Sequence, residues 1–165
     1  MAWLKLFSWG WAQTTSTSIT RDRTSSRRGE PGDEALLDGR LVGCTRFLEI
    51  RRWRGRPAPD EVEIGGTWLA ADLQRTAVNT EAKLLLLGHA FEVWQVVRVA
   101  IATDSRNERS RRAIERIGAR LEGVLRHHRP SMVPGEAGRP RDTALYSITD
   151  DDWPAVRQTL VDRLS

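Results

Sequence analysis

The pattern of apolar and polar positions predicts short strands and amphipathic helices from about residue 35 onward. Polar and apolar residues alternate from Glu61 to Ile64, as in a half-buried strand, and the strand continues through Gly65 and Gly66 to Leu69. Two glycines inside a strand indicate a β-bulge or a close backbone approach. A helix is predicted over residues 81–94, because apolar residues recur there at spacings of three and four: Leu84, Leu87, Phe91 and Trp94.

The second half of the chain repeats this alternation. Residues 96–102 are apolar and β-branched, as expected of a strand buried on both faces. A helix follows from Asn107 and ends near Gly118, and a terminal helix runs from Trp153 to about Leu164. Further strands are predicted at 41–48, after a hairpin turn at Asp38-Gly39, and at 121–128 and 143–149. The order strand-strand-helix-strand-helix-strand-strand-helix predicts an α/β (α+β) fold with a mixed sheet.

Residues 1–35 differ from the rest of the chain. Their start is rich in tryptophan, and a polar tract leads into residues 21–31, which have almost no apolar content. Such a composition favours disorder, and the segment does not fit a signal peptide. We therefore place the folded domain at residues 36–165. The tryptophan-rich start would expose apolar surface, so we also expect a homodimer.

Composition limits the classes of function. The chain has 165 residues, enough for one domain, and no apolar run reaches the ~20 residues that span a bilayer. Its net charge is +4, but the arginines are interleaved with Asp and Glu, unlike a nucleic-acid interface. A phosphate-bearing small ligand would also suit a basic surface. The excess of arginine over lysine is typical of a GC-rich bacterial genome.

The cysteine and histidine pattern bears on compartment and metals. Cys44 is the only cysteine, which excludes an internal disulfide and fits the reducing cytoplasm. The chain has no CxxC or HxxxH spacing, so we predict no metal site.

The segment from Trp68 to Lys83 gives the first indication of chemistry. A strand disturbed by glycines runs into a short loop and then opens a helix, whose first turn carries unpaired N–H groups and the positive end of a dipole. Amides of residues 75–80 could converge on a pyrophosphate. An ordinary strand-to-helix connection has the same pattern, so this segment alone leaves both interpretations open.

Three motifs in order resemble one family. Residues 74–83 resemble the acetyl-CoA loop of GNAT acetyltransferases, whose pattern is Q/R-x-x-G-x-G/A. The spacing Asp104-x-x-Asn107-x-x-Ser110, continued to Gly118-Ala119, resembles the second motif of the RimJ/RimL-type branch, and residues 121–126 and 141–147 resemble its closing strands. The resemblance spans about residues 40–155. It implies a mixed, mostly antiparallel sheet flanked by helices, with central strands splayed apart over 63–69 and 97–103.

The resemblance also implies a site for acetyl-CoA. The pantetheine arm would lie between the splayed strands, beside Trp68 and Leu69. Asn107 would reach the arm from the next helix, although Asn also fills a helix N-cap well and both roles are compatible. The pyrophosphate would lie over the loop and the helix start, at Gln74, Arg75, Thr76, Ala77, Val78, Asn79 and Thr80.

The implied reaction transfers an acetyl group to a primary amine, either a protein N-terminus or a small molecule. Amides near Gly65-Gly66 would stabilise the oxyanion, and Glu63 would take a proton from the ammonium group. Glu61 could act through water, but a solvated strand face is favoured for it and is the alternative for Glu63. Ser110 could protonate the leaving thiolate, and a small helix-packing residue is the equal alternative there.

The sequence departs from the family pattern in three places. Ala77 stands where the loop usually has Gly, and Asn79 where it has Gly or Ala; since Ala tolerates left-handed backbone poorly, loop closure is expected to suffer. Ile114 replaces the tyrosine that often protonates the thiolate. Residues 1–35 do not resemble the strand and helices with which the family begins. The alternative to an active enzyme is therefore a truncated, catalytically weak acyl-CoA-binding domain.

Overall fold

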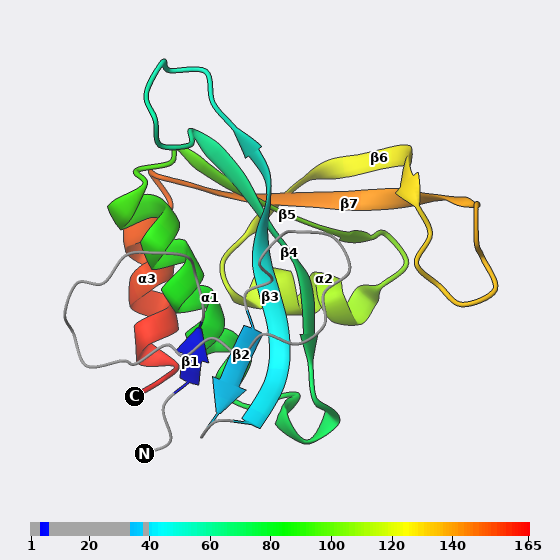
Figure 1. Ribbon diagram of the computed structural model, residues 1–165, viewed down its shortest axis with the longest axis horizontal. Helices are drawn as coiled ribbons and strands as arrows, with labels where there is room; N and C mark the ends of the chain where they lie inside the picture. The colour runs from blue at the N-terminus through cyan, green and yellow to red at the C-terminus, as the bar shows by residue number, and fades with distance from the viewer. Residues whose placement is uncertain (1–3, 7–33, 38–39) are drawn as a thin grey trace.

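The computed structural model describes residues 4–6, 34–37 and 40–165 and contains one seven-stranded sheet (Figure 1). The sheet order is β1-β2-β3-β4-β5-β7-β6, with β4 and β5 parallel and every other neighbouring pair antiparallel. The predicted mixed, mostly antiparallel sheet is therefore confirmed. The strands are β1 Leu4–Leu6, β2 Glu34–Leu37, β3 Arg40–Arg51, β4 Glu61–Leu69, β5 Arg98–Asp104, β6 Arg120–Pro130 and β7 Pro140–Thr149.

The helices lie between and after the central strands. They are the 3-10 helix η1 Ala71–Leu73, α1 Val78–Gly88, the π-helix η2 His89–Val93, α2 Glu108–Arg116 and α3 Trp153–Asp162. The helix expected over 81–94 thus begins three residues earlier and widens at its end, where the N–H of Trp94 donates to the carbonyl of His89 at 3.0 Å.

All three α-helices contribute to one apolar core on one face of the sheet. Val62 and Ile64 of β4 and Val99 and Ile101 of β5 point into it, as the alternation of side chains along a strand requires. Figure 1 shows α1 and α3 side by side, and the ring of Phe91 in η2, which continues α1, stacks on the ring of Trp153 in α3 with centroids 5.3 Å apart. The helices contribute Ala82, Leu86 and Leu87 from α1, Ile114 from α2, and Val156 and Leu160 from α3.

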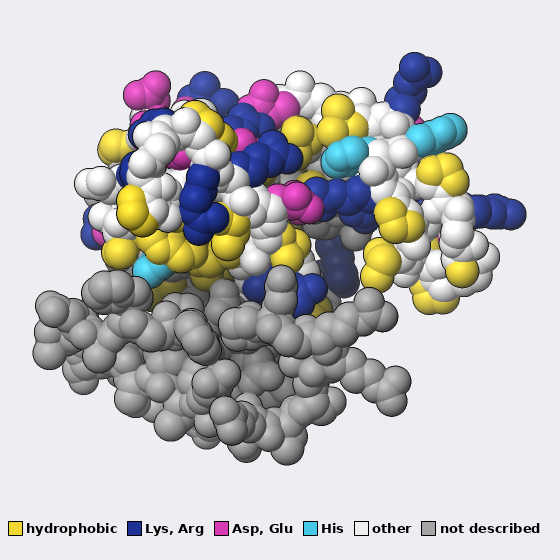
Figure 2. Space-filling model, turned by 45° about the horizontal axis from the view of Figure 1, so that its top comes forward, with side chains coloured by type: hydrophobic (Ala, Val, Ile, Leu, Met, Phe, Trp, Pro, Cys, Tyr) yellow, Lys and Arg dark blue, Asp and Glu magenta, His cyan; other side chains and the backbone are white. Residues whose placement is uncertain are grey.

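The opposite face of the central strands is polar. Glu61 and Glu63 of β4 alternate with the core residues, and their register partners on β5 are Arg98 and Ala100. Arg98 binds Glu61 at 3.5 Å and Glu122 of β6 at 2.6 Å. We call this the polar face. On the face drawn in Figure 2, basic and acidic side chains are interspersed rather than gathered into one basic patch.

The segment that the composition sets apart, residues 1–35, is described only in part. Leu4–Leu6 forms β1, which pairs antiparallel with β2 at the outer edge of the sheet. The polar tract predicted to be disordered and the tryptophan-rich residues after β1 lie outside the described residues, as does the hairpin turn at residues 38–39.

Candidate functional site

The most distinctive feature of the sheet is the divergence of its two central strands. β4 and β5 pair only at Glu61, Val62 and Glu63, opposite residues 98–100. Beyond this apex β4 continues to Leu69 and β5 to Asp104, and the two strands separate (Figure 1). The splayed central strands predicted from the resemblance are confirmed. Their facing edges present backbone groups with which an extended ligand could pair as an added strand.

A bulge in β4 lies beside this opening. Cys44 pairs with Trp68 and Arg46 with Gly65, so three residue steps on β4 face two on β3. Gly66 has φ +61°, and a Cβ there would lie 3.0 Å from Nε of Arg46. The bulge expected from the glycine pair is therefore confirmed, because only glycine adopts this backbone without strain. Trp68, just beyond the bulge, is 51% exposed.

The loop from Gln74 to Ala77 connects β4 to α1 through η1. Gln74 donates from Nε2 to the carbonyl of Leu69 at 3.1 Å, which ties the loop to the end of β4. Thr76 donates from Oγ1 to the carbonyl of Leu73 at 2.7 Å and accepts from the N–H of Val78 at 3.4 Å. These bonds fix the loop directly before the first turn of α1.

The expected strain at Ala77 is not found. Ala77 is the N-cap of α1 with φ −64° and ψ −19°, and Asn79 lies inside the helix, so neither needs left-handed backbone. Arg75 takes that conformation instead, at φ +66°. The expectation of left-handed backbone at Ala77 is wrong, because the chain turns two residues earlier; the effect of Ala77 on loop closure around a phosphate stays a prediction. The helix starts without a side-chain cap, which leaves the N–H groups of Asn79 and Thr80 in its first turn, at the positive end of the dipole.

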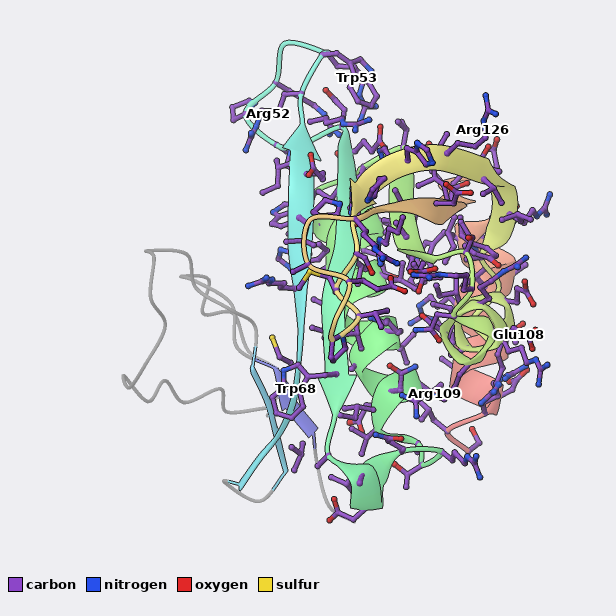
Figure 3. All side chains as sticks on the ribbon, turned by 90° about the vertical axis from the view of Figure 1, so that its right-hand side faces the viewer. Arg52, Trp53, Trp68, Glu108, Arg109 and Arg126 are labelled. Atoms are coloured by element: carbon purple, nitrogen blue, oxygen red, sulfur yellow. The ribbon has the colours of Figure 1, made fainter. Side chains whose placement is uncertain are left out.

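Two arginines stand near this helix start. Arg75 is exposed in the loop itself. Arg109 of α2 donates from a terminal nitrogen to Oε1 of Gln74 at 3.1 Å, which joins the second helix to the loop. Figure 3 shows Arg109 and Trp68 toward the end of β4 that leads into η1. Guanidinium groups beside a helix N-terminus provide a site for phosphate oxygens. Sequence reasoning did not single out Arg109, although it lies two residues after Asn107.

Asn107 and Ser110 lie at the start of α2. Asn107 is the N-cap, and its Oδ1 accepts from the N–H of Ser110 at 3.0 Å. The capping role is thus observed. It uses only the Oδ1 atom of the Asn107 side chain, and the NH2 group of the same amide takes no part in it. Ile114 is 7% exposed and packs in the core, so this position serves packing.

Glu63 lies at the apex where β4 and β5 separate. It is only 5% exposed, and its two oxygens accept from the two terminal nitrogens of Arg129 at 2.8 and 2.7 Å. These hydrogen bonds raise the pKa of Arg129. Glu63 points to the polar face, whereas α2 and Ser110 lie on the helical face. The structure does not bring these two candidates into contact within the described part of the chain.

Lys83 is a buried cation that the sequence analysis did not select. It lies on the buried side of α1, 5% exposed, and its Nζ donates to Oγ1 of Thr45 and to Oγ1 of Thr67, both at 2.8 Å. Burial lowers the pKa of Lys83 to about 7, although the charge of Cys44 raises it. Thr67 follows Gly66, so Lys83 ties α1 to the bulge. The sequence does contain one sign of this buried cation, because Lys83 lies beside apolar positions of the predicted helix.

Other kinds of site find little support among the described residues. They contain no group of three or more His, Cys, Asp and Glu side chains that could hold a metal ion. No helix in the described ranges is long and apolar enough to cross a membrane. A pocket of about 390 Å³ lies away from the opening between β4 and β5, and no predicted site residue lines it. Its lining consists of Ile50, Arg52, Pro57, Ala58, Pro59, Val93 and Trp94.

Comparison with known proteins identifies relatives of this arrangement. Residues 5–120 match the family model of the acetyltransferase (GNAT) domain. The "Putative ribosomal N-acetyltransferase YdaF" of Bacillus subtilis (strain 168) is 33% identical over 118 residues, which cover 72% of this chain and 58% of YdaF.

Solved structures show the same fold. A GCN5-related N-acetyltransferase from Brucella melitensis superposes with a TM-score of 0.69 at 31% identity, over 81% of this chain and 57% of that one. Mycobacterium smegmatis RimJ in complex with CoA-disulfide gives a TM-score of 0.65 at 25% identity, over 79% of this chain and 58% of RimJ. The chain therefore spans less than two thirds of the length of each of these relatives.

Proposed function

Since the chain belongs to the GNAT acetyltransferase family, we propose that it moves the acetyl group of acetyl-CoA to a primary amine. The amine is a protein N-terminus or belongs to a small molecule. The observation that carries the proposal is the opening between β4 and β5, which leads directly to the uncapped start of α1. We assign the acetyltransferase domain to residues 36–165, with β1 joined at the edge of its sheet.

The proposed cofactor site follows this opening. The facing edges of β4, up to Trp68 and Leu69, and of β5 would hydrogen-bond the pantetheine arm. The residues from Gln74 to Thr80 would hold the pyrophosphate through backbone N–H groups and the Arg75 guanidinium, with Arg109 beside them. Asn107 would donate from its amide NH2 group to the arm. The loop geometry fits this ligand, because the only left-handed residue in it, Arg75, precedes the helix start.

The proposed chemistry uses both sides of the opening. Amides near Gly65 and Gly66 would donate to the carbonyl oxygen as negative charge develops on it. Glu63 would take the proton that the acceptor ammonium must lose before the amine nitrogen bonds to the acetyl carbon. Ser110, from the helical face, would give a proton to the sulfur as the carbon–sulfur bond breaks. The amine nitrogen loses its second proton as the amide forms, which would restore the Ser110 hydroxyl, and the proton taken by Glu63 would pass to solvent.

Thiol release from acetyl-CoA tests the proposal against a panel of peptides with free N-termini and small primary amines. We expect release with at least one class of amine, and a strong loss with Glu63→Gln. An unchanged melting temperature in the presence of CoA would contradict the cofactor site itself.

A second function is CoA binding without transfer. One observation favours it: both oxygens of Glu63 are held by Arg129. It predicts a raised melting temperature with CoA and no thiol release with any amine in the panel.

A further inference from the structure

The ion pair between Glu63 and Arg129 joins strands that are far apart in the sheet. β6 is the outermost strand, and β7 and β5 lie between it and β4. Three strand spacings of about 4.8 Å separate β6 from β4 by about 14 Å in a flat sheet, which is more than an arginine side chain spans. The two side chains nevertheless meet at 2.7 Å. The end of β6 must therefore leave the plane of the sheet.

The register shows how β6 leaves it. Leu125 pairs with Thr143 and Arg129 with Arg141, so four residue steps on β6 face two on β7. Inside this bulge His127 has φ +50°, and its N–H donates to Oδ1 of Asp142 at 2.8 Å. Bulges of this kind bend a strand and redirect its side chains. The hairpin consequently arches over the sheet (Figure 3).

The residues of β5 that lie beneath the bent end of β6 leave a path for the Arg129 side chain. Thr143 pairs with Asp104, so Arg141 and Arg129 lie past the last residue of β5, whereas Glu63 pairs with Ala100 near the start of that strand. The polar-face positions between these two points are Ala100 and Ala102, whose small side chains leave room above β5 for a long side chain; Ala100 is accordingly buried.

A second contact holds the same hairpin at the other end of β5. Glu136, in the loop after β6, accepts from two terminal nitrogens of Arg106 at 3.0 and 2.8 Å and from the hydroxyl of Ser131 at 2.6 Å. Arg106 also binds Asp104 at 2.8 Å. The hydrogen bonds from Arg106 lower the pKa of Glu136 to about 2, so this contact stays charged over the physiological range. Residues 129–141, the hairpin clamp, are therefore held to the rest of the sheet at two points, Glu63 at the apex and Arg106 just beyond the end of β5.

We propose that Arg129 is a positioning residue, which fixes the orientation of the Glu63 carboxylate at the apex toward the acceptor amine. The inference rests on the proposed function. A carboxylate has about four lone-pair sites, and the bidentate pair with Arg129 uses one on each oxygen. The remaining sites face away from the guanidinium and can accept from an ammonium group. Arg129 thus holds the proton acceptor in one geometry without occupying all of it.

The test compares Arg129→Gln and Arg129→Lys with Arg126→Gln, which removes an exposed arginine of the same strand (Figure 3). We expect Arg129→Gln to lower kcat for the acceptor on the order of 10- to 100-fold, the cost of a misplaced reacting group. The KM for acetyl-CoA should stay unchanged, because Glu63 lies near the start of β4 and the phosphate loop follows the other end of that strand. Arg129→Lys keeps the positive charge but loses the two parallel hydrogen bonds of the guanidinium group, so its kcat should lie between those of Arg129→Gln and the unsubstituted chain. Arg126→Gln should behave as the unsubstituted chain.

The outcomes separate this inference from the proposed function. No thiol release by the unsubstituted chain with any amine would overturn the proposed function, and this inference with it. Normal kcat in Arg129→Gln, with or without a lower melting temperature, would overturn the inference alone. If Arg129→Gln does not fold, Arg129→Lys decides: kcat equal to that of Arg126→Gln would refute the positioning role, and a lower kcat at unchanged KM would support it.

Discussion

Asn107 combines a structural role with a proposed chemical one, and the two can be separated by substitution. Its Oδ1 caps α2, whereas its NH2 group is the proposed donor to acetyl-CoA. Asn107→Ser keeps a good N-cap and removes the NH2 donor, so it should unfold like the original chain but bind CoA more weakly. Asn107→Ala should also lose about 1 kcal/mol of stability. Thermal melts measure the stability of the two variants, and CoA titrations measure their affinity. Full CoA affinity in Asn107→Ser would show that Asn107 caps α2 and does not bind the cofactor.

Lys83 is costly to bury as a cation, so its environment should influence stability. The hydroxyls of Thr45 and Thr67 lie 2.9 Å apart and can bond each other without it. Replacing Lys83 with Met would therefore leave these two hydroxyls paired with each other. The residue thus provides a link between stability and pH.

The direction of that link follows from the lowered pKa. Between about 7 and 10.5 the unfolded chain holds a proton on Lys83 that the folded chain has lost, so the free energy of unfolding rises with pH across this window. Lys83→Met lacks this dependence. Its advantage over the original chain should be largest near pH 6 and shrink by at most about 1.4 kcal/mol per pH unit up to about pH 9.

Urea unfolding at several pH values measures this difference. Arg112→Met, which removes an exposed cation of α2, is the control and should give a difference that does not vary with pH. A constant difference for Lys83→Met as well would show that the Lys83 proton is not linked to folding.

At the scale of elements, the bulge of β4 should matter for both stability and cofactor binding. Gly66→Ala places a Cβ at φ +61° and should cost about 1–2 kcal/mol, while Gly66→Asn should cost less because Asn tolerates this backbone. Gly55 has φ +69° in the β3–β4 loop, with open space around it. Gly55→Ala is thus the matched control: it should lose similar stability in urea unfolding but keep CoA affinity. Equal CoA affinity in both variants would show that the bulge does not contribute to cofactor binding.

The elements that could be predicted from the sequence are those governed by local chemistry. The alternation in β4, its glycine bulge and the N-cap at Asn107 each follow from a few neighbouring residues. The start of α1 was misplaced because the left-handed turn falls on Arg75, where no glycine or asparagine signals it. The clamp could not be predicted, since the contact between Arg129 and Glu63 spans 66 positions and depends on how far β6 bends. Lys83 was missed for a similar reason, because its partners belong to two distant strands.

At the scale of the whole molecule, the sheet consists of two halves joined by a narrow seam. β1 to β4 form one half and β5, β7 and β6 the other, and three residue pairs connect them. Two other sets of contacts join the halves: the apolar core beneath α1 and α3, and the ion pairs of the polar face. A ligand that pairs with both facing edges would therefore add hydrogen bonds where the sheet has fewest.

Hydrogen exchange with and without CoA tests this arrangement over the whole chain. At a CoA concentration about 100 times its Kd, binding should stabilise the folded state by about 2.7 kcal/mol. Protection should increase most at residues 64–69, 101–104 and 74–80, because N–H groups of the facing edges and the helix start gain partners there. The β3–β4 loop at residues 52–58 lies outside the opening and is the internal control. Protection that rises equally in this loop, or only in β6, would contradict a ligand held between β4 and β5.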